Sequence, residues 1–206
     1  TRGLSVVIAE GALNRMVNDY RRHGKSKTAL AGAGTIIVHE QIHVLQRCFP
    51  RKFSGLYTGA YGFIDGRVEQ DEWVARNEIQ NPDGLEGNRW VVDYEGNHYW
   101  LKTILDEKDD PARMPASFRE AIMPLQKTGK IYRVIWKKGE KKPEVVDPNL
   151  MRDWKKQFPI RAGHDHPNEI FAYLFQAELT RKIMEEEPSD DMMTKKTMEW
   201  ARKELR

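Results

Sequence analysis

Two histidines stand four residues apart in the segment TIIVHEQIHVLQR, residues 35–47, and a glutamate directly follows the first. A helix places residues i and i+4 on one face, so His39 and His43 can both reach one Zn²⁺ ion at about 2.0–2.1 Å. Glu40 lies about 100° further round the helix, where its carboxylate can take a proton from a water on that ion. The H-E-x-x-H spacing therefore predicts metal-assisted hydrolysis with Glu40 as general base. The alternative is a polar helix face whose histidines are simply solvated.

Apolar residues recur at helical spacing through the same segment: Val38, Ile42, Leu45 and Phe49. This period predicts a helix over residues 35–49, broken at Pro50. His39, His43 and Gln46 lie on an adjacent face of that helix. We therefore expect the helix to pack its apolar stripe into a core while both imidazoles face a cleft.

A catalytic zinc ion needs a third protein ligand and one open position. Glu169 is the candidate, at the start of a second predicted helix over residues 167–187. Its carboxylate could instead complete a capping box or interact favourably with the positive end of the helix dipole. His164 and His166 are rival ligands or groups that bind substrate, and Asp165 is expected to cap the helix.

HEQIH at residues 39–43 and NEIFA after His166 and Pro167 resemble two motifs of the zincin metallopeptidases. More narrowly they resemble the gluzincins, in which a glutamate on a later helix completes the site. The resemblance implies one Zn²⁺ ion held by His39, His43 and Glu169, and a peptide or protein substrate. It also implies a zincin-like helical core with an active-site helix and a small antiparallel sheet.

The likeness covers less than a fifth of the chain. More than a hundred residues separate His43 from Glu169, which is far longer than in the thermolysin pattern. A long insertion is therefore required.

In a zinc peptidase of this kind, the tetrahedral intermediate needs an electrophilic partner besides zinc. Tyr173, one turn past Glu169, and His166 are the candidates for this catalytic role, and Tyr57, Tyr61 and Tyr132 are less constrained. Gln46, Asn168 and Asp165 are candidates for orienting the imidazoles.

The remaining pattern predicts helices, then strands, then helices, which is typical of an α+β fold. We expect a short apolar start that runs into an amphipathic helix over residues 5–22, a flexible approach over 23–34, a loop or short turns over 54–66 and a helix over 69–79. A hairpin is expected over 89–105, a short helix over 115–126, a second hairpin over 130–147 and a last helix over 189–206. This organisation predicts a single domain over 1–206 with a hairpin-rich insertion at about 88–147.

Composition excludes some classes of protein. The 206 residues carry a formal net charge of only +3, with basic and acidic residues mixed, so no nucleic-acid partner is expected. No apolar run approaches 18 residues, so no membrane span is expected. Cys48 is the only cysteine and no disulfide can form within the chain, which suits the cytosol and is compatible with export. The chain opens without Met or a signal-peptide pattern, as a processed, soluble fragment would. Compartment and oligomeric state are not indicated.

Three functions compete at this point. The first is a zinc metallopeptidase. The second is a catalytically inactive binding or toxin-associated module that keeps the zincin fold. The third is a structural zinc domain, which would close the site with a fourth ligand such as His164 or His166.

Overall fold

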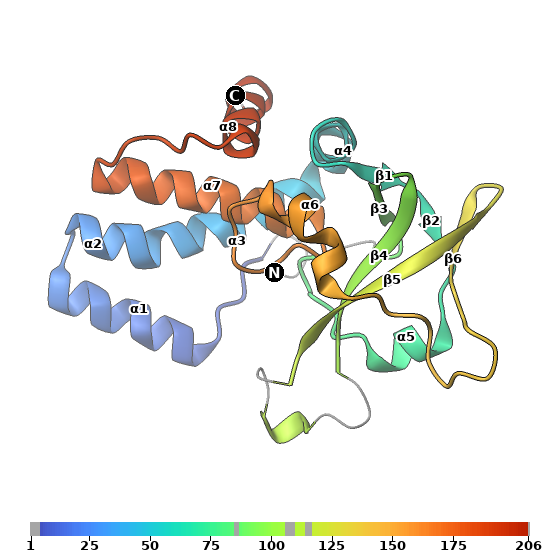
Figure 1. Cartoon of the computed structure of the whole chain (residues 1–206). Coiled ribbons are helices and arrows are strands. Elements are labelled where there is room, and N and C mark those ends of the chain that lie inside the picture. The colour runs from blue at the N-terminus through green and yellow to red at the C-terminus, as the bar shows by residue number, and fades with distance from the viewer. Residues whose placement is uncertain (1–4, 85–86, 106–109, 114–116, 206) are drawn as a thin grey trace.

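The computed structural model describes residues 5–84, 87–105, 110–113 and 117–205 (Figure 1). Helices from both ends of the chain lie together on one side of the molecule, and strands from its middle lie on the other. The helices are α1 (Glu10–His23), α2 (Lys27–Ala29), α3 (Thr35–Cys48), α4 (Pro50–Gly59), α5 (Glu72–Asn77), α6 (Arg152–Lys156), α7 (Pro167–Met184) and α8 (Met192–Glu204). The strands are β1 (Phe63–Asp65), β2 (Arg67–Val68), β3 (Trp90–Tyr94), β4 (Asn97–Ile104), β5 (Arg119–Thr128) and β6 (Ile131–Val134).

The strands form one sheet in the order β1-β3-β4-β5-β6-β2. Its two edge strands, β1 and β2, are separated in the chain by Gly66 alone, so the sheet must curl until its edges meet. A hydrogen bond from Val68 N to Asn88 O at 2.8 Å crosses this seam, while Glu69 N donates to Tyr132 O of β6 at 2.8 Å on the other side of β2. A Cβ on Gly66 would lie 2.7 Å from the ring of Tyr132, so the turn at the seam requires glycine. The result is a nearly closed six-stranded sheet.

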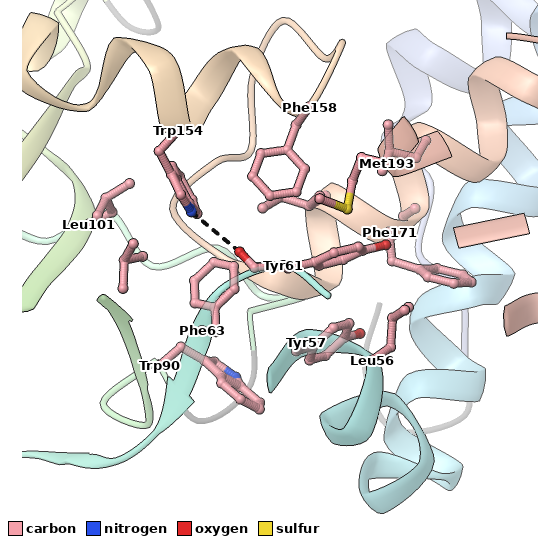
Figure 2. Packing of buried hydrophobic residues seen from close by; sticks show 14 of the residues in the cluster. Leu56, Tyr57, Tyr61, Phe63, Trp90, Leu101, Trp154, Phe158, Phe171 and Met193 are labelled. Atoms are coloured by element: carbon pink, nitrogen blue, oxygen red, sulfur yellow. Dashed lines mark hydrogen bonds between the residues drawn. The ribbon is translucent and has the colours of Figure 1, made fainter. Parts of the chain in front are cut away.

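Strand β5 contributes to two hydrophobic cores, one on each face of the sheet. Ile122 belongs to the core shared with the helices, whereas Ala121, Met123 and Leu125 belong to the other. Alternation of this kind is expected of a strand, because successive side chains point to opposite faces. Aromatic rings dominate the shared core, where Trp154 Nε1 donates to the carbonyl of Tyr61 (Figure 2). Members of this core are Leu56, Tyr57, Tyr61, Phe63, Trp90, Leu101, Trp154, Phe158, Phe171 and Met193.

The burial of β5 on both faces explains one wrong prediction. In place of the helix expected over residues 115–126, the chain forms strand β5 from Arg119 onward, after a turn at 117; residues 114–116 lie outside the described part. A strand buried on both faces carries a continuous apolar run, and such a run does not distinguish strand from helix by its period.

The second hairpin is also differently paired. Strand β6 pairs with β5 through a turn at Gly129, whose φ is +62°. The second half of the predicted hairpin lies wholly within the described residues and forms no strand of its own. It meets the sheet through two hydrogen bonds, from Glu144 N to Ile135 O and from Val146 N to Ile122 O. By contrast, the hairpin predicted over 89–105 is confirmed as β3 and β4, joined by a tight turn at Glu95 and Gly96, both with positive φ.

Two segments expected to be irregular contain helices. In the predicted loop over 54–66, residues 54–59 belong to α4 and residues 63–65 form β1. The buried Phe53, Leu56 and Tyr57 of α4 stand at helical spacing, and its first residue is Pro50. The predicted flexible approach over 23–34 contains α2, capped by the side chain of Ser26, and a π-helical turn that continues into α3. Small residues in this turn let α7 pack closely beside it.

Three helices position the functional residues. Helix α3 packs along α7, and α4 folds back from the end of α3 at Pro50. The ring of Phe53 on α4 meets Phe171 of α7 and Trp200 of α8 at centroid distances of 5.1 and 4.9 Å. Among the described residues, no helix combines the length and apolar character needed to cross a membrane.

The aromatic core generates a stability prediction. Phe158 is 2% exposed and its ring lies 5.0 Å from Trp154 and 5.4 Å from Tyr61. Phe158→Ala should lower the free energy of unfolding in urea by about 3–5 kcal/mol, because it leaves a cavity among fixed rings. Phe49→Ala, at a side chain 48% exposed, should cost less than about 0.5 kcal/mol. Equal losses in the two variants would contradict this core.

Candidate metal centre

The helix pair α3 and α7 brings three predicted ligands together. His39 and His43 are buried on one face of α3, and Glu169 is buried in the first turn of α7. His39 Nε2 lies 3.5 Å from Glu169 Oε2, and His43 Nε2 lies 3.4 Å from Glu169 Oε1. The ligand atoms of all three residues lie within 4.8 Å of one another. They form a group able to hold a metal ion.

These separations fit the size of a zinc ion. Two atoms that each bind a tetrahedral Zn²⁺ at about 2.0–2.1 Å lie about 3.4 Å from one another. The two imidazole–carboxylate distances match that value and exceed the length of about 2.7–2.9 Å usual for a charge-assisted hydrogen bond. The arrangement therefore suits ligands placed around an ion better than direct hydrogen bonding between them.

Hydrogen bonds fix the tautomer of His43. Gln46 Nε2 lies 2.9 Å from the backbone carbonyl of Asn168, which can only accept, so this atom of Gln46 is the amide nitrogen. Gln46 Oε1 then faces His43 Nδ1 at 2.8 Å and must accept its proton. Nε2, the other ring nitrogen, faces Glu169 Oε1 at 3.4 Å. The ring is thus prepared to bind a cation.

The same hydrogen-bond network ties three parts of the chain to the site. Gln46 Nε2 also donates to the hydroxyl of Tyr57 on α4, and Tyr57 donates to Asn168 Oδ1 at 2.9 Å. Asn168 Nδ2 in turn donates to the carbonyl of Asp83 at 3.0 Å. Burial raises the pKa of the Tyr57 hydroxyl well above its usual value, so this group keeps its proton. Of the residues predicted to orient the imidazoles, Gln46 contacts His43 directly and Asn168 acts through Gln46.

The buried carboxylate of Glu169 is stabilised by polar neighbours, which offset the cost of removing its charge from water. Burial alone would raise the pKa of Glu169, but contacts with His39 and His43 and a hydrogen bond from Asn81 Nδ2 outweigh burial and lower it. The pKa therefore moves below its usual value of 4.5. A group with a lowered pKa stabilises the folded state above its unfolded pKa, and this contribution is lost as pH falls through the folded value. Glu169 is consequently an anion near neutral pH, as a cation ligand must be.

Tyr173 lies beside the ligands. Its ring centroid is 4.7 Å from that of His39, and its side chain is 36% exposed. Burial raises its pKa, and the negative charges of Glu169, Glu40 and Asp165 raise it further. The tyrosine is therefore a protonated donor at the border between the ligands and solvent. Glu40, half-buried on α3 next to His39, is close enough to act on the same hydroxyl electrostatically.

The histidines before α7 serve other purposes. His166, rather than Asp165, caps the helix: its Nδ1 accepts the backbone N–H of Asn168 at 3.1 Å. The expectation that Asp165 caps α7 is thus wrong, since its carboxylate accepts from the hydroxyl of Thr103 on β4. His164 lies near Phe158, and burial lowers its pKa. Neither His164 nor His166 joins the group of ligands found among the described residues.

Sequence reasoning missed Asn81, which donates to Glu169 Oε1 at 2.7 Å. Asn81 belongs to the turn NPDG, where Asp83 N donates to Asn81 Oδ1 at 2.9 Å. Arg47 of α3 holds this turn through an ion pair with Asp83 at 2.9 Å. The turn signal was visible in the sequence, but no local pattern shows that the turn meets α7.

Comparison with known proteins identified no relative of this chain. No protein family model matches the chain, and no curated protein or solved structure matches it. The resemblance to zincins therefore rests on the residues of the two motifs and on the geometry described above.

The role of Gln46 can be tested directly. Gln46→Leu should weaken zinc affinity about 10- to 100-fold, because His43 loses the acceptor that fixes its ring. Competition with a chromogenic chelator measures this change. Gln41→Leu, at an exposed position of the same helix, is the matched control and should leave affinity unchanged. Unaltered affinity in Gln46→Leu would contradict the orienting role.

Metal binding should also stabilise the folded chain. Zn²⁺ at about 100 times its dissociation constant should raise the free energy of unfolding by about 2.7 kcal/mol. Chemical denaturation with and without the ion measures the increase. His43→Ala should abolish the gain, whereas His23→Ala, at an exposed residue ending α1, should retain it. A gain that survives His43→Ala would place the ion elsewhere.

Proposed function

We propose that the chain is a zinc-dependent metallopeptidase in which Zn²⁺ is held by His39, His43 and Glu169. The observation that supports this function is the convergence of three buried side chains: each imidazole Nε2 lies 3.4–3.5 Å from an oxygen of Glu169, and the ligand atoms lie within 4.8 Å of one another. Two imidazoles and one carboxylate form a donor set typical of catalytic zinc, which keeps a further position for water or substrate. Glu40 follows His39 directly, as the H-E-x-x-H motif requires of a general base.

A bound zinc ion would supply Lewis-acid chemistry, polarising a carbonyl and lowering the pKa of a bound water toward about 7. The chain's own groups would perform the proton transfers. Glu40 would accept the proton of the attacking water and deliver it to the leaving amine. Tyr173 would donate a hydrogen bond to the developing oxyanion, a role favoured by its raised pKa and its position beside His39.

The buried Gln46 network would act as the positioning device. Its hydrogen bonds engage Nδ1 of His43 and leave Nε2 directed at Glu169, where it would serve as the metal ligand. His166, proposed from sequence as a catalytic residue, is better suited to holding the first turn of α7, because its Nδ1 is already engaged by Asn168 N. Tyr173 is therefore preferred as the electrophilic partner.

A zinc-binding module without turnover is the alternative that shares this ligand set. The partial exposure of Tyr173 favours catalysis, since a group at the border of the site can meet a substrate. A purely structural zinc site would need a fourth ligand. The position of His166 as the cap of α7 and the burial of His164 beside Phe158 argue against either supplying it.

One substitution separates the enzyme from the inactive module. Glu40→Gln should retain stoichiometric zinc and lower peptide hydrolysis by at least about 100-fold, because the general base is lost while the ligands remain. Cleavage of a fluorogenic random-peptide library, with metal content measured in parallel, tests this. Glu10→Gln, at an exposed glutamate of α1, is the control. Equal turnover by Glu40→Gln and the unmodified protein would overturn the mechanism.

A further inference from the structure

A groove leads away from the candidate metal centre along α7. Its volume is about 730 Å³. One wall is a single face of α7, and the other is the segment 159–162 that precedes it. Residues of the α7 wall recur at helical spacing: Tyr173, Gln176, Ala177, Thr180 and Arg181.

Tyr173 joins this groove to the metal centre. The same ring that lines the groove lies 4.7 Å from the ring of His39. Gly163, with φ of +83°, connects the outer wall to the site, since a Cβ there would lie 2.8 Å from Glu169 Cβ and 3.0 Å from the Tyr173 ring. A chain lying in the groove would therefore reach the ligands at its Tyr173 end.

The groove changes character along its length. Ile160, Ala162 and Ala177 make its middle apolar. Its charged lining consists of two arginines and one acid: the exposed Arg161 on the outer wall, Arg181 at the far end of the α7 wall, and Glu186 beside Arg181. The groove therefore carries a net positive charge. Arg181 forms a pair with Glu186 at 3.7 Å, but both side chains are largely exposed, so the pair is weak and leaves further guanidinium donors for a carboxylate.

Helix geometry sets the distance between the charge and the chemistry. Tyr173 and Arg181 are eight residues apart, which corresponds to about 12 Å along α7. An extended peptide advances about 3.3 Å per residue, so this span holds three to four residues. A substrate side chain beside Arg181 would thus lie three or four residues from the bond at the metal centre.

We propose that this groove is a substrate-binding subsite that selects an acidic side chain three or four residues from the scissile bond, with Arg161 and Arg181 as specificity-determining residues. The inference rests on the proposed peptidase function and adds the class of substrate to it. Small and apolar residues of the peptide would cover Ile160 and Ala177. The carboxylate would be held by one or both guanidinium groups, which favour carboxylates through paired N–H donors.

The test is cleavage-site profiling of a random-peptide library by the zinc-loaded protein. Mass spectrometry of the products should show enrichment of Asp and Glu at the third or fourth residue on one side of the cleaved bond. Arg161→Glu and Arg181→Glu should each lower that enrichment about tenfold, by replacing an attraction with a repulsion. The enrichment should also fall as salt is raised from low to high concentration, because exposed charges are screened.

Lys182→Glu is the matched control. It makes the same change of charge at the neighbouring residue of α7, but Lys182 lines a different groove, between α7 and α8. It should leave the profile unchanged. Zinc content and the circular dichroism spectrum confirm that each variant is folded. Cleavage without acidic enrichment, or the same loss in Lys182→Glu as in Arg181→Glu, would overturn the subsite and leave the peptidase function standing.

A binding measurement separates failure of the subsite from failure of the enzyme. Glu40→Gln, which cannot turn over the peptide, is titrated into fluorescently labelled library peptides that are either Glu-rich or the matched Gln-rich form. Tighter binding of the Glu-rich pool, lost in the double variant with Arg181→Glu, supports the groove even if the unmodified protein cleaves nothing. Equal anisotropy curves for both pools overturn it.

Discussion

The carboxylate of Glu169 is buried between two imidazoles, and the packing of α3 against α7 must keep it there. A buried anion is costly unless it is paired and hydrogen-bonded. Here the compensation comes from His39, His43 and Asn81, which together lower the pKa of Glu169 against the effect of burial. Because burying this carboxylate is costly, the hydrogen bond from Asn81 must be held in place. The turn that carries Asn81 is anchored to α3 by the ion pair between Arg47 and Asp83. The turn around Asn81 and its anchor Arg47 thus stabilise the buried negative charge of Glu169.

The two histidines are held by different means. His43 is 1% exposed and its ring is fixed by a hydrogen bond to Gln46, which also binds Asn168. His39 packs against the ring of Tyr173, and its Nδ1 has no hydrogen-bond partner among the described residues. The hydrogen-bonded side of the site faces α4 and the core, whereas the side held by ring packing faces the groove. Substrate would therefore meet the site where it is less constrained by the protein.

The helices that carry the ligands were predictable from sequence, α3 from the spacing of its apolar residues and α7 from Pro167 at its start. The apolar stripe of α3 does not pack as expected, however, because Leu45 and Phe49 are exposed while the face with both histidines is buried. Their contact was not, since 126 positions separate His43 from Glu169 and no local pattern encodes which helices meet. The resemblance to gluzincins supplied that pairing, and the structure brings the residues together. Helix α4 was missed because its glycines and tyrosines suggest a loop, although Phe53 and Tyr57 keep helical spacing. Strand β5 was mistaken for a helix because it is buried on both faces, which removes the alternation by which strands are recognised.

Gly163 shows how one backbone position joins the groove to the ligands. Its φ of +83° is a conformation that residues with a side chain rarely adopt, and a Cβ would also collide with Glu169 and Tyr173. The glycine lets the segment after Pro159 pass close to the first turns of α7, so the chain that forms the outer wall of the groove lies against Glu169 and Tyr173. Any larger residue would push that wall away from Tyr173 or displace Glu169 from the histidines. The absence of a side chain at this single residue is therefore a condition for both the packing of Glu169 and the position of the groove wall beside Tyr173.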